Sequence, residues 1–350
     1  MTTATAQAPA AAVRAARAAG RRRGRVVVLG LALLALAVAA GSLCVGDYAV
    51  AVPDVARTLL GRGDGMEEFV VMRLRLPRLV MAALVGAAFA LSGAIFQSVL
   101  DNALASPDII GITWGATFAA VTALVVFGLS GVVVAFSAFG GALLVALAIW
   151  LLSWRRGASG HRFVLVGIAL AFMMNAAVGY LLTRADIHDA QTAWVWLVGS
   201  VSGPGWDEIG TAAAAIALIA PAVAVLAPRL RALQLGDDAA TGLGVRAERA
   251  RLLLLLAAVA LAAVGTAAAG PVAFVGFLSA PIARRLVGDG SPALAASALV
   301  GVLVVTASDL AAQHLLPGGV QMPVGVVTGA VGAPYLLWLL AVADRGRALA

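Results

Sequence analysis

Long apolar runs alternate with short polar connectors from residue 26 almost to the C-terminus. Each run is close to the roughly 20 residues that an α-helix needs to cross the hydrocarbon core of a bilayer. The runs lie near residues 26–45, 78–98, 108–127, 132–152, 163–183, 208–227, 252–270, 272–287, 293–315 and 323–343. This pattern predicts an all-α, polytopic membrane protein with about ten transmembrane helices.

The same pattern divides the chain into a basic tail at 1–25, a transmembrane domain at 26–343 and a short tail at 344–350. The first apolar run is longer than the 7–15-residue core of a signal peptide, which favours a spanning helix over a cleaved leader. The polar stretch LDNALASPDIIG, 100–111, interrupts two apolar runs and is therefore predicted to be a connector.

Composition excludes several classes of protein. Of 350 residues, 62% are hydrophobic and 12% are charged, against roughly 25% charged in soluble domains. The single cysteine, Cys44, excludes a disulfide within the chain. All basic residues are arginine, so the lysine of a GxxxxGK[ST] phosphate-binding loop is missing and any ATP must be hydrolysed by another chain.

The arginines indicate the orientation in the membrane, because cytoplasmic segments carry the excess of basic residues. One set of connectors holds Arg57, Arg62, Arg73, Arg75, Arg78 and Arg184. The alternate set holds Arg14, Arg17, Arg21, Arg22, Arg23, Arg25, Arg155, Arg156, Arg162, Arg229, Arg231, Arg246, Arg249, Arg251, Arg284, Arg285, Arg345 and Arg347. The larger set is predicted to be cytoplasmic. Because it includes the arginines of both tails, both termini are predicted to be cytoplasmic. Since these arginines lie between apolar runs and form no single polar face, nucleic acid is not an expected partner.

Acids and metal ligands are scarce. The outer connector with Asp186, His188 and Asp189 has no ligand spacing of a known metal site and is interpreted as a solvated loop. Asp309 is the exception within the spans. An intramembrane carboxylate could relay protons, as in a proton-coupled secondary carrier, or could simply pair or reach water. A bare cation would need more acids along its path, so the spans suit a bulky chelate or another large organic solute.

Two stripes of small residues recur at every fourth position, Ala82, Gly86, Ala90 and Ala94 in one run and Gly325, Gly329 and Ala333 in another. Small residues at this spacing let helices approach closely in lipid. Helix–helix packing is the favoured interpretation for both stripes, and a wall of a transport path is the alternative.

Three arginines, Arg73, Arg75 and Arg78, precede or open the second span on its outer side. Pro77 suits the first turn of that helix, where its missing N–H has no intrahelical partner. The arginines either snorkel to lipid headgroups or form an exposed basic platform for an acidic soluble partner.

The longest internal polar segment is RLRALQLGDDAATGLGVRAERAR, 229–251. Gly236, Asp237 and Asp238 predict a helix start, and Gly242 and Gly244 predict its end. Such a short helix is unstable alone. It packs either on the protein's own cytoplasmic surface or in a groove of a cytoplasmic partner.

Seven segments, in order, resemble the FecCD family of ABC-transporter permeases, which import iron–siderophores, haem and cobalamin. They are RLPR (75–78), GAAFALSGAIFQ (86–97), DNALASPDIIG (101–111), WLVGSVSG (196–203), LGDDAATGLGV (235–245), AGPVAFVGF (269–277) and MPVGVVTGAVGAP (322–334). The resemblance covers residues 26–342, and ASPDIIG with GITWGA looks most like the enterobactin-type, catecholate branch.

The resemblance implies a type II ABC importer permease fold of ten helices in the bacterial cytoplasmic membrane. A second permease subunit, two cytoplasmic ATPases that carry ATP and magnesium, and an extracytoplasmic siderophore-binding protein are the implied partners. This chain itself would bind no cofactor or metal and would not be an enzyme. LDNALASPDIIG would be an inner turn with a structural role.

The resemblance also implies the site residues. Arg75 and Arg78 match arginines that meet glutamates of the binding protein. The segment that couples to the ATPases would be Gly236, Asp237, Asp238, Ala239, Ala240, Thr241, Gly242, Leu243 and Gly244. The fifth and tenth helices would line the path with Met173, Met174, Asn175 and Thr328.

Several positions depart from the family pattern. Ala103 replaces a proline, and Ala280 and Pro281 replace a Pro-His pair. Gln313 stands where some members have a further docking arginine, and Gln321 replaces a glutamate. One docking contact is then absent or supplied by a different second subunit, which favours a heterodimer.

Overall fold

The structure is a computed structural model that describes residues 4–153, 160–314 and 321–348. Of the predicted inner arginines, Arg155 and Arg156 lie outside the described residues, as do the side chains of Arg14, Arg17, Arg345 and Arg347. The elements are α1 (Ala4–Cys44), α2 (Val52–Leu59), α3 (Gly65–Glu68), the π-helix η1 (Phe69–Arg75), α4 (Leu76–Val99), α5 (Pro107–Ile110), α6 (Ile112–Val125), α7 (Val132–Ser153), α8 (Gly160–Arg184), α9 (Ile187–Val198), α10 (Trp206–Leu233), α11 (Asp237–Gly242), α12 (Ala247–Ala269), α13 (Val275–Val287), α14 (Leu294–His314) and α15 (Val324–Ala348).

A helix covers each of the ten predicted apolar ranges, but the helices differ in length. Among the described residues, seven are long and apolar enough to cross a membrane. They are α1, the continuous helix Gly65–Val99, α7, α8, α10, α12 and α14. The apolar helices Ile112–Val125 and Val324–Leu339 are shorter, and α13 has 13 residues.

The predicted span at 108–127 is broken near its start. Gly111 has a left-handed backbone, with φ at 90°, and it separates α5 from α6. A Cβ atom there would lie 2.7 Å from the Gly167 carbonyl oxygen of α8. Gly111 is buried, which is the condition under which non-helical backbone is tolerated at membrane depth.

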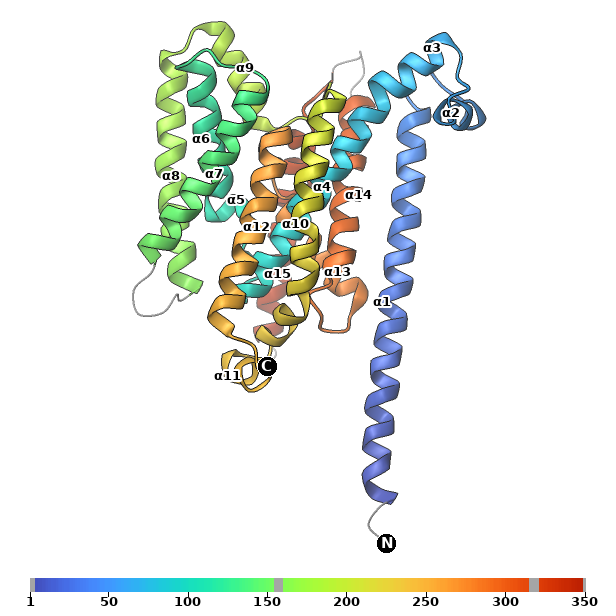
Figure 1. Ribbon diagram of the computed structural model, residues 1–350, viewed down its shortest axis with the longest axis vertical. Helices are drawn as coiled ribbons and strands as arrows, with labels where there is room; N and C mark the ends of the chain where they lie inside the picture. The colour runs from blue at the N-terminus through green and yellow to red at the C-terminus, as the bar shows by residue number, and fades with distance from the viewer. Residues whose placement is uncertain (1–3, 154–159, 315–320, 349–350) are drawn as a thin grey trace.

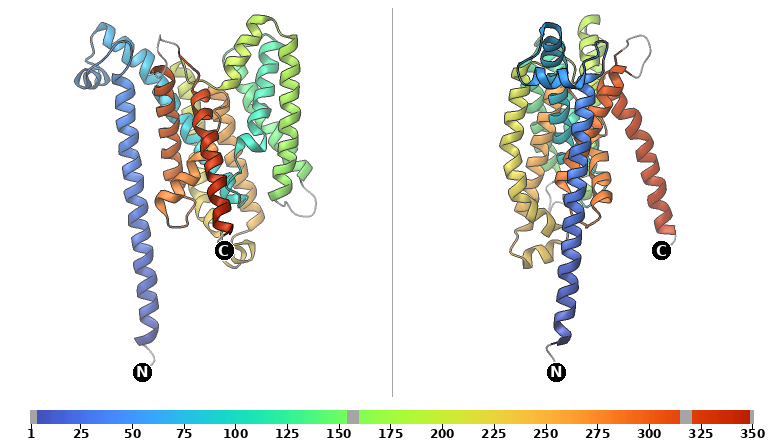
Figure 2. Two further views of the ribbon diagram at one scale, coloured as in Figure 1. Left: turned by 180° about the vertical axis from the view of Figure 1, so that it is seen from behind. Right: turned by 90° about the vertical axis from the view of Figure 1, so that its right-hand side faces the viewer.

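Helix α4 runs through the middle of the bundle, where it packs against α10, α12, α13 and α14 (Figure 1). Its polar side chains bond to these neighbours: Ser92 donates to the Ala258 carbonyl at 2.7 Å, and Gln97 donates to the Phe277 carbonyl at 3.1 Å. Helices α6 to α9 form a second group beside this centre, joined to it by α7 against α12. Figure 2 shows α1 on the opposite flank, where it packs on α14.

The small-residue stripe of α4 is a helix-packing stripe, as predicted. Ala82, Ala90 and Ala94 are fully buried. Gly86 faces Gly301 of α14 so closely that a Cβ on Gly86 would lie 2.4 Å from the Gly301 carbonyl oxygen. The small residues therefore permit the contact between α4 and α14.

The stripe of α15 differs from the favoured interpretation. Gly325 packs against the end of α9, where a Cβ would overlap the Val198 carbonyl oxygen. Gly329 has nothing within 4 Å of such an atom, and Ala333 is exposed. Only the first residue of this stripe is used for packing between described helices, and the rest of it faces outward.

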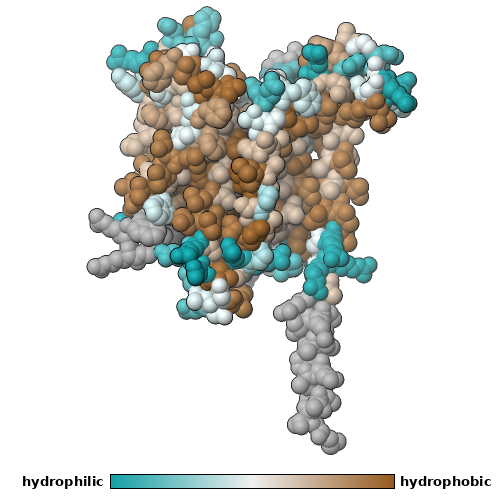
Figure 3. All heavy atoms as spheres, in the orientation of Figure 1, coloured by the Kyte–Doolittle hydropathy of each residue, from teal (hydrophilic) through white to brown (hydrophobic). Residues whose placement is uncertain are grey.

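The two ends of the bundle carry different elements. Both chain termini and α11 lie at one end, and α2, α3 and α9 lie at the other (Figure 1). Asp101 of the LDNALASPDIIG turn lines a cavity with Asp237 and Arg251, so this turn lies at the α11 end. Figure 3 shows hydrophobic side chains over the middle of the visible face and hydrophilic ones toward both ends.

Gly86→Ala should destabilise the protein by about 1–3 kcal/mol, because the added methyl group must push α4 and α14 apart. Gly210→Ala in α10 is the matched control, since a Cβ there meets nothing within 4 Å. It should be neutral or stabilising by up to about 1 kcal/mol. Thermal unfolding in mild detergent measures both, and equal unfolding temperatures for the two variants would contradict the close contact.

Candidate functional site

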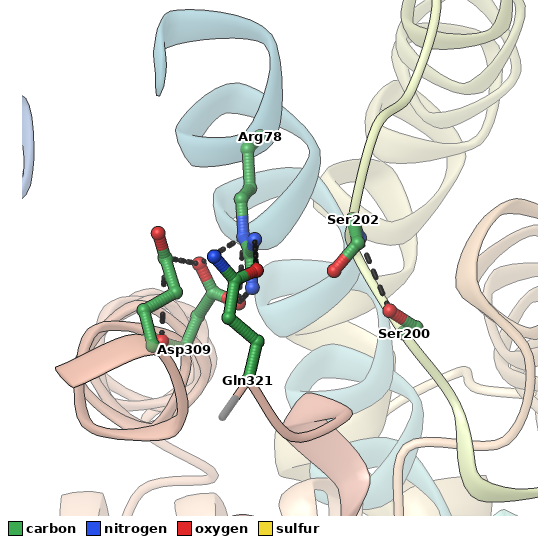
Figure 4. A network of polar contacts seen from close by, with 6 residues as sticks. Arg78, Ser200, Ser202, Asp309 and Gln321 are labelled. Carbon is green, nitrogen blue, oxygen red and sulfur yellow. Dashed lines mark hydrogen bonds and ion pairs between the residues drawn. The ribbon is translucent and has the colours of Figure 1, made fainter. Parts of the chain in front are cut away.

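The N-terminal end of α4 carries a buried ion pair (Figure 4). Arg78 donates from Nε to Asp309 Oδ1 at 3.0 Å and to Oδ2 at 2.9 Å, and from Nη2 to Oδ1 at 2.8 Å. Both residues are buried, at 9% and 5% exposure. The pair joins α4 to α14 and satisfies the intramembrane carboxylate that the sequence singles out.

Two glutamines complete this network. Gln313 donates to Asp309 Oδ2 at 2.8 Å, and Gln321 accepts from Arg78 Nη1 at 3.5 Å. In the sequence, these two positions stand out only as departures from the family pattern. In the structure they hydrogen-bond the ion pair, and Gln321 ties the segment before α15 to it.

Arg78 is therefore not part of an exposed basic platform, contrary to that interpretation of the sequence. Arg75 is also engaged within the chain, since it donates to the Leu43 carbonyl at 2.7 Å and to the Tyr48 carbonyl. Gly46 leaves room for this guanidinium, because a Cβ there would lie 2.3 Å from Arg75 Nη2. Arg73 is the exposed member of the three. Contact of Arg75 and Arg78 with a binding protein stays a prediction.

The local backbone explains where these arginines lie. Pro77 stands in the first turn of α4, as predicted, and it lacks an N–H to bond to the preceding turn. That preceding turn is the π-helix η1, which carries Arg73 and Arg75. The sequence does not show that the helix begins as early as Gly65, nor that α2 and α9 form in the connectors.

At the opposite end, α11 forms over Asp237–Gly242, which confirms the predicted start and end. Gly236 and Gly244 on either side have positive φ values of 95° and 81°. Asp237 pairs with Arg251 of α12 at 3.0 Å, and Ala240 is fully buried. These contacts hold the short helix on the protein's own surface.

The remaining apolar side chains of this segment are uncovered. Leu235 and Leu243 are each 65% exposed, and Ala239 is exposed too. Only Ala240 of the predicted apolar face packs inward. Leu235, Ala239 and Leu243 leave an exposed apolar patch beside α11.

The predicted path residues separate into two groups. Met173 and Asn175 lie on the exposed side of α8, and Met174 is half-buried. Thr328 is fully buried and donates to the Gly325 carbonyl at 3.2 Å. Thr328 is thus enclosed within this chain, and its place on a path stays a prediction.

The LDNALASPDIIG turn is held by its own polar groups. Asn102 accepts from the Leu104 N–H at 2.9 Å, and Ser106 accepts from the Ile109 N–H to cap α5. The Asp108 carboxylate is enclosed near the Thr113 hydroxyl and the Phe274 N–H, without hydrogen-bonding geometry to either. This arrangement agrees with a structural turn.

Metal-binding clusters are not found in the described part of the chain, where no three His, Cys, Asp or Glu residues lie close enough to share an ion. Asp186 precedes α9, and His188 and Asp189 lie exposed in its first turn. His161 is outside the residues whose side chains are described.

Comparison with known proteins relates this geometry to a family. Residues 32–342 match the FecCD transport family. The chain is 41% identical to the ferric enterobactin transport system permease protein FepG of Escherichia coli (strain K12), over 90% of this chain and 96% of that protein. It is 36% identical to the Fe(3+)-citrate import system permease protein YfmE of Bacillus subtilis (strain 168), over 91% and 96%.

A solved structure has the same fold. It is an inward-facing conformation of a protein assigned to the metal-chelate type of ABC transporter. It superposes with a TM-score of 0.81 at 28% sequence identity, and the match covers 91% of this chain and 99% of that one.

Breaking the buried pair should be costly. Arg78→Gln or Asp309→Asn alone should destabilise the protein by about 3–5 kcal/mol, because each leaves a buried charge without its partner. The double variant should cost less than the sum of the two. Thermal unfolding of the unaltered protein, the two single variants and the double variant gives a double-mutant cycle. If the stability losses of the two single variants simply add up in the double variant, the two side chains do not interact.

Proposed function

The chain belongs to the FecCD transport family, and on that premise we propose that it is the permease subunit of an ABC importer that moves ferric siderophore inward across the cytoplasmic membrane. The observation that carries this proposal is the family match over residues 32–342. The relatives named for ferric enterobactin and ferric citrate transport support a ferric chelate as cargo. The chain is not itself an enzyme, and ATP and magnesium belong to separate ATPase subunits.

We propose ten spans, formed by the seven long helices and by α6, α13 and α15. A helix shorter than the bilayer can still serve as a span where other parts of the protein surround it. The buried break at Gly111 between α5 and α6 supports such an arrangement.

The positive-inside rule assigns the α11 end to the cytoplasm. Arg21 to Arg25, Arg229 to Arg251 and Arg284 to Arg285 supply the basic residues of that end. Both termini would then be cytoplasmic, and α2, α3, η1 and α9 would face outward.

The outer end is the proposed docking surface for the siderophore-binding protein. Exposed Arg73 can receive an acidic side chain directly. Contact through Arg75 or Arg78 requires these residues to exchange their present partners, the carbonyls of Leu43 and Tyr48 and the carboxylate of Asp309. Such an exchange would be coupled to opening of the α4–α14 contact.

The inner end is the proposed ATPase contact. The segment Gly236–Gly244 is anchored by Ala240 and by the Asp237–Arg251 pair, so force applied to α11 reaches α12 directly. The exposed Leu235 and Leu243 supply apolar contact area for the ATPase.

The path is proposed to lie along the outward faces of α8 and α15. Met173 and Asn175 are exposed on one helix, and Gly329 and Ala333 face outward on the other. These side chains suit a large organic chelate better than a bare cation. A second permease subunit would close the path. The altered positions Gln313 and Gln321 favour a different chain over a second copy.

Haem or cobalamin is the alternative cargo within the family. A proton-coupled carrier using Asp309 is the alternative of another class. The Arg78–Asp309 pair argues against the carrier, because it accounts for the intramembrane acid as a structural partner of arginine.

The decisive experiment is uptake of labelled ferric catecholate by proteoliposomes that contain the chain with its co-purifying proteins. Uptake should require both ATP and the binding protein. Uptake driven by a proton gradient in the absence of an ATPase would overturn the proposal. Competition by unlabelled ferric citrate, haem or cobalamin identifies the cargo.

Ala239→Asp combined with Leu243→Asp should abolish ATP-dependent uptake and co-purification of the ATPase, because two charges would enter the proposed apolar contact. The unfolding temperature should stay unchanged, since both side chains are exposed. Leu60→Asp, at a 76% exposed position at the other end, is the control and should keep the ATPase bound. Retained coupling in the α11 variant would refute this contact.

Asp309→Asn should lower stability while leaving the uptake that remains dependent on ATP and independent of a proton gradient. The comparison is made per folded protein, with folding followed by size-exclusion chromatography. Loss of a proton-gradient response that the unaltered protein possesses would instead identify a carrier.

A further inference from the structure

A basic cavity opens at the α11 end of the protein, between α1, the end of α10 and the loop that joins α13 to α14. Its volume is about 530 Å³. Arg21 and Arg25 line it from α1, and Arg231 lines it from α10. Neither the coupling segment nor the ion pair at the outer end contributes to it.

One face of α1 forms a wall of this cavity. Arg21, Gly24, Arg25, Val28 and Leu29 all line it, and their spacing places them on one side of a helix. The basic residues come first and the apolar residues follow, in the direction that enters the membrane. This order matches a phospholipid, whose charged headgroup lies outside its acyl chains.

A separate arginine holds this wall in place. Arg23 donates from Nε to the Leu286 carbonyl at 3.1 Å. Its guanidinium covers Gly288, where a Cβ would lie 2.9 Å from Arg23 Cζ. The contact fixes the inner end of α1 against the loop after α13, so that Arg21 and Arg25 remain turned toward the cavity.

The charges of the cavity are unbalanced. Asp289 is its acidic side chain, and its Oδ1 accepts from the Ser291 N–H at 2.9 Å. Burial alone would raise the pKa of Asp289, but the bonds from Ser291 and the charge of Arg231 hold that pKa below its usual value. Three arginines thus face one ionised carboxylate. Among the described residues, Arg21, Arg25 and Arg231 make no hydrogen bond or salt bridge.

We propose that this cavity binds the headgroup of an anionic phospholipid of the inner leaflet. Guanidinium groups bind phosphate oxygens through paired N–H donors. A basic pocket between membrane helices on the cytoplasmic side is a known form of lipid-headgroup site. Val28 and Leu29 beyond the arginines supply the surface for the acyl chains. The two excess positive charges favour a headgroup with two phosphates, as in cardiolipin, over a headgroup with one.

The test is native mass spectrometry of the full chain in mild detergent, titrated with cardiolipin, phosphatidylglycerol or phosphatidylcholine. The unaltered protein should retain one anionic lipid, with cardiolipin bound most tightly, and should not retain phosphatidylcholine. Replacing Arg21, Arg25 and Arg231 together by Gln should weaken that binding by at least about tenfold, since each arginine near the surface contributes to attraction of anionic lipid.

The matched control replaces Arg229, Arg246 and Arg249 by Gln. These exposed arginines lie at the same end and carry the same charge, but they do not line the cavity. The control protein should bind cardiolipin as the unaltered protein does. If both triple variants lost cardiolipin binding to the same extent, the lipid would be held by the general positive charge of this end and not by the cavity. If phosphatidylcholine bound as tightly as cardiolipin, the protein would not recognise the headgroup. Either result would overturn the proposal.

Two further measurements keep the test decisive. If the triple variant does not fold, Arg231→Gln alone, at an exposed position, should weaken binding about fivefold. Inorganic phosphate at millimolar concentration should not displace the lipid. Displacement would show a site for free phosphate and would overturn the assignment to lipid.

Discussion

The contact between α4 and α14 is the constraint on which the rest of the structure depends. Lipid supplies no water, so a buried guanidinium and a buried carboxylate must satisfy each other. Arg78 and Asp309 do so near the N-terminal end of α4, and the backbone contact of Gly86 with Gly301 holds the two helices closely together. The other helices of the centre, α10, α12 and α13, pack around the α4 that this contact positions.

The two ends of this central unit have different chemistry. At the end that carries η1, Arg75 is engaged with backbone carbonyls and Arg78 with Asp309, so any partner that bound these arginines would have to compete for them. At the opposite end, α11 is anchored through Ala240 and Arg251, while the neighbouring Leu235 and Leu243 stay exposed. Helix α4 packs against both α14, which carries Asp309, and α12, which carries Arg251.

Sequence reasoning succeeded where the physical cause was local. The apolar runs have a helix over each of them, Pro77 lies in the first turn of α4, and α11 begins and ends at the predicted residues, because hydrophobic length, proline and glycine act on their own segment. It was less successful for α2, η1 and α9, which are each shorter than a membrane span and lie in segments that the sequence indicates only as connectors. It did not anticipate that Thr328 is buried within the chain or that Gly329 and Ala333 of the α15 stripe face outward, because burial of a helix face depends on which neighbour that face meets.

By itself, the sequence determined that this protein is helical and embedded in a membrane. It also determined that the chain lacks the lysine of an ATP-binding phosphate loop and carries the motifs of its family. Tertiary structure alone decided that Arg78 belongs with Asp309, which is 231 positions away, and that Arg21, Arg25 and Arg231 share a cavity. The reason is that charge and hydropathy are properties of single residues and short windows. The partner of a charge is set by the packing of distant helices, which no local pattern records.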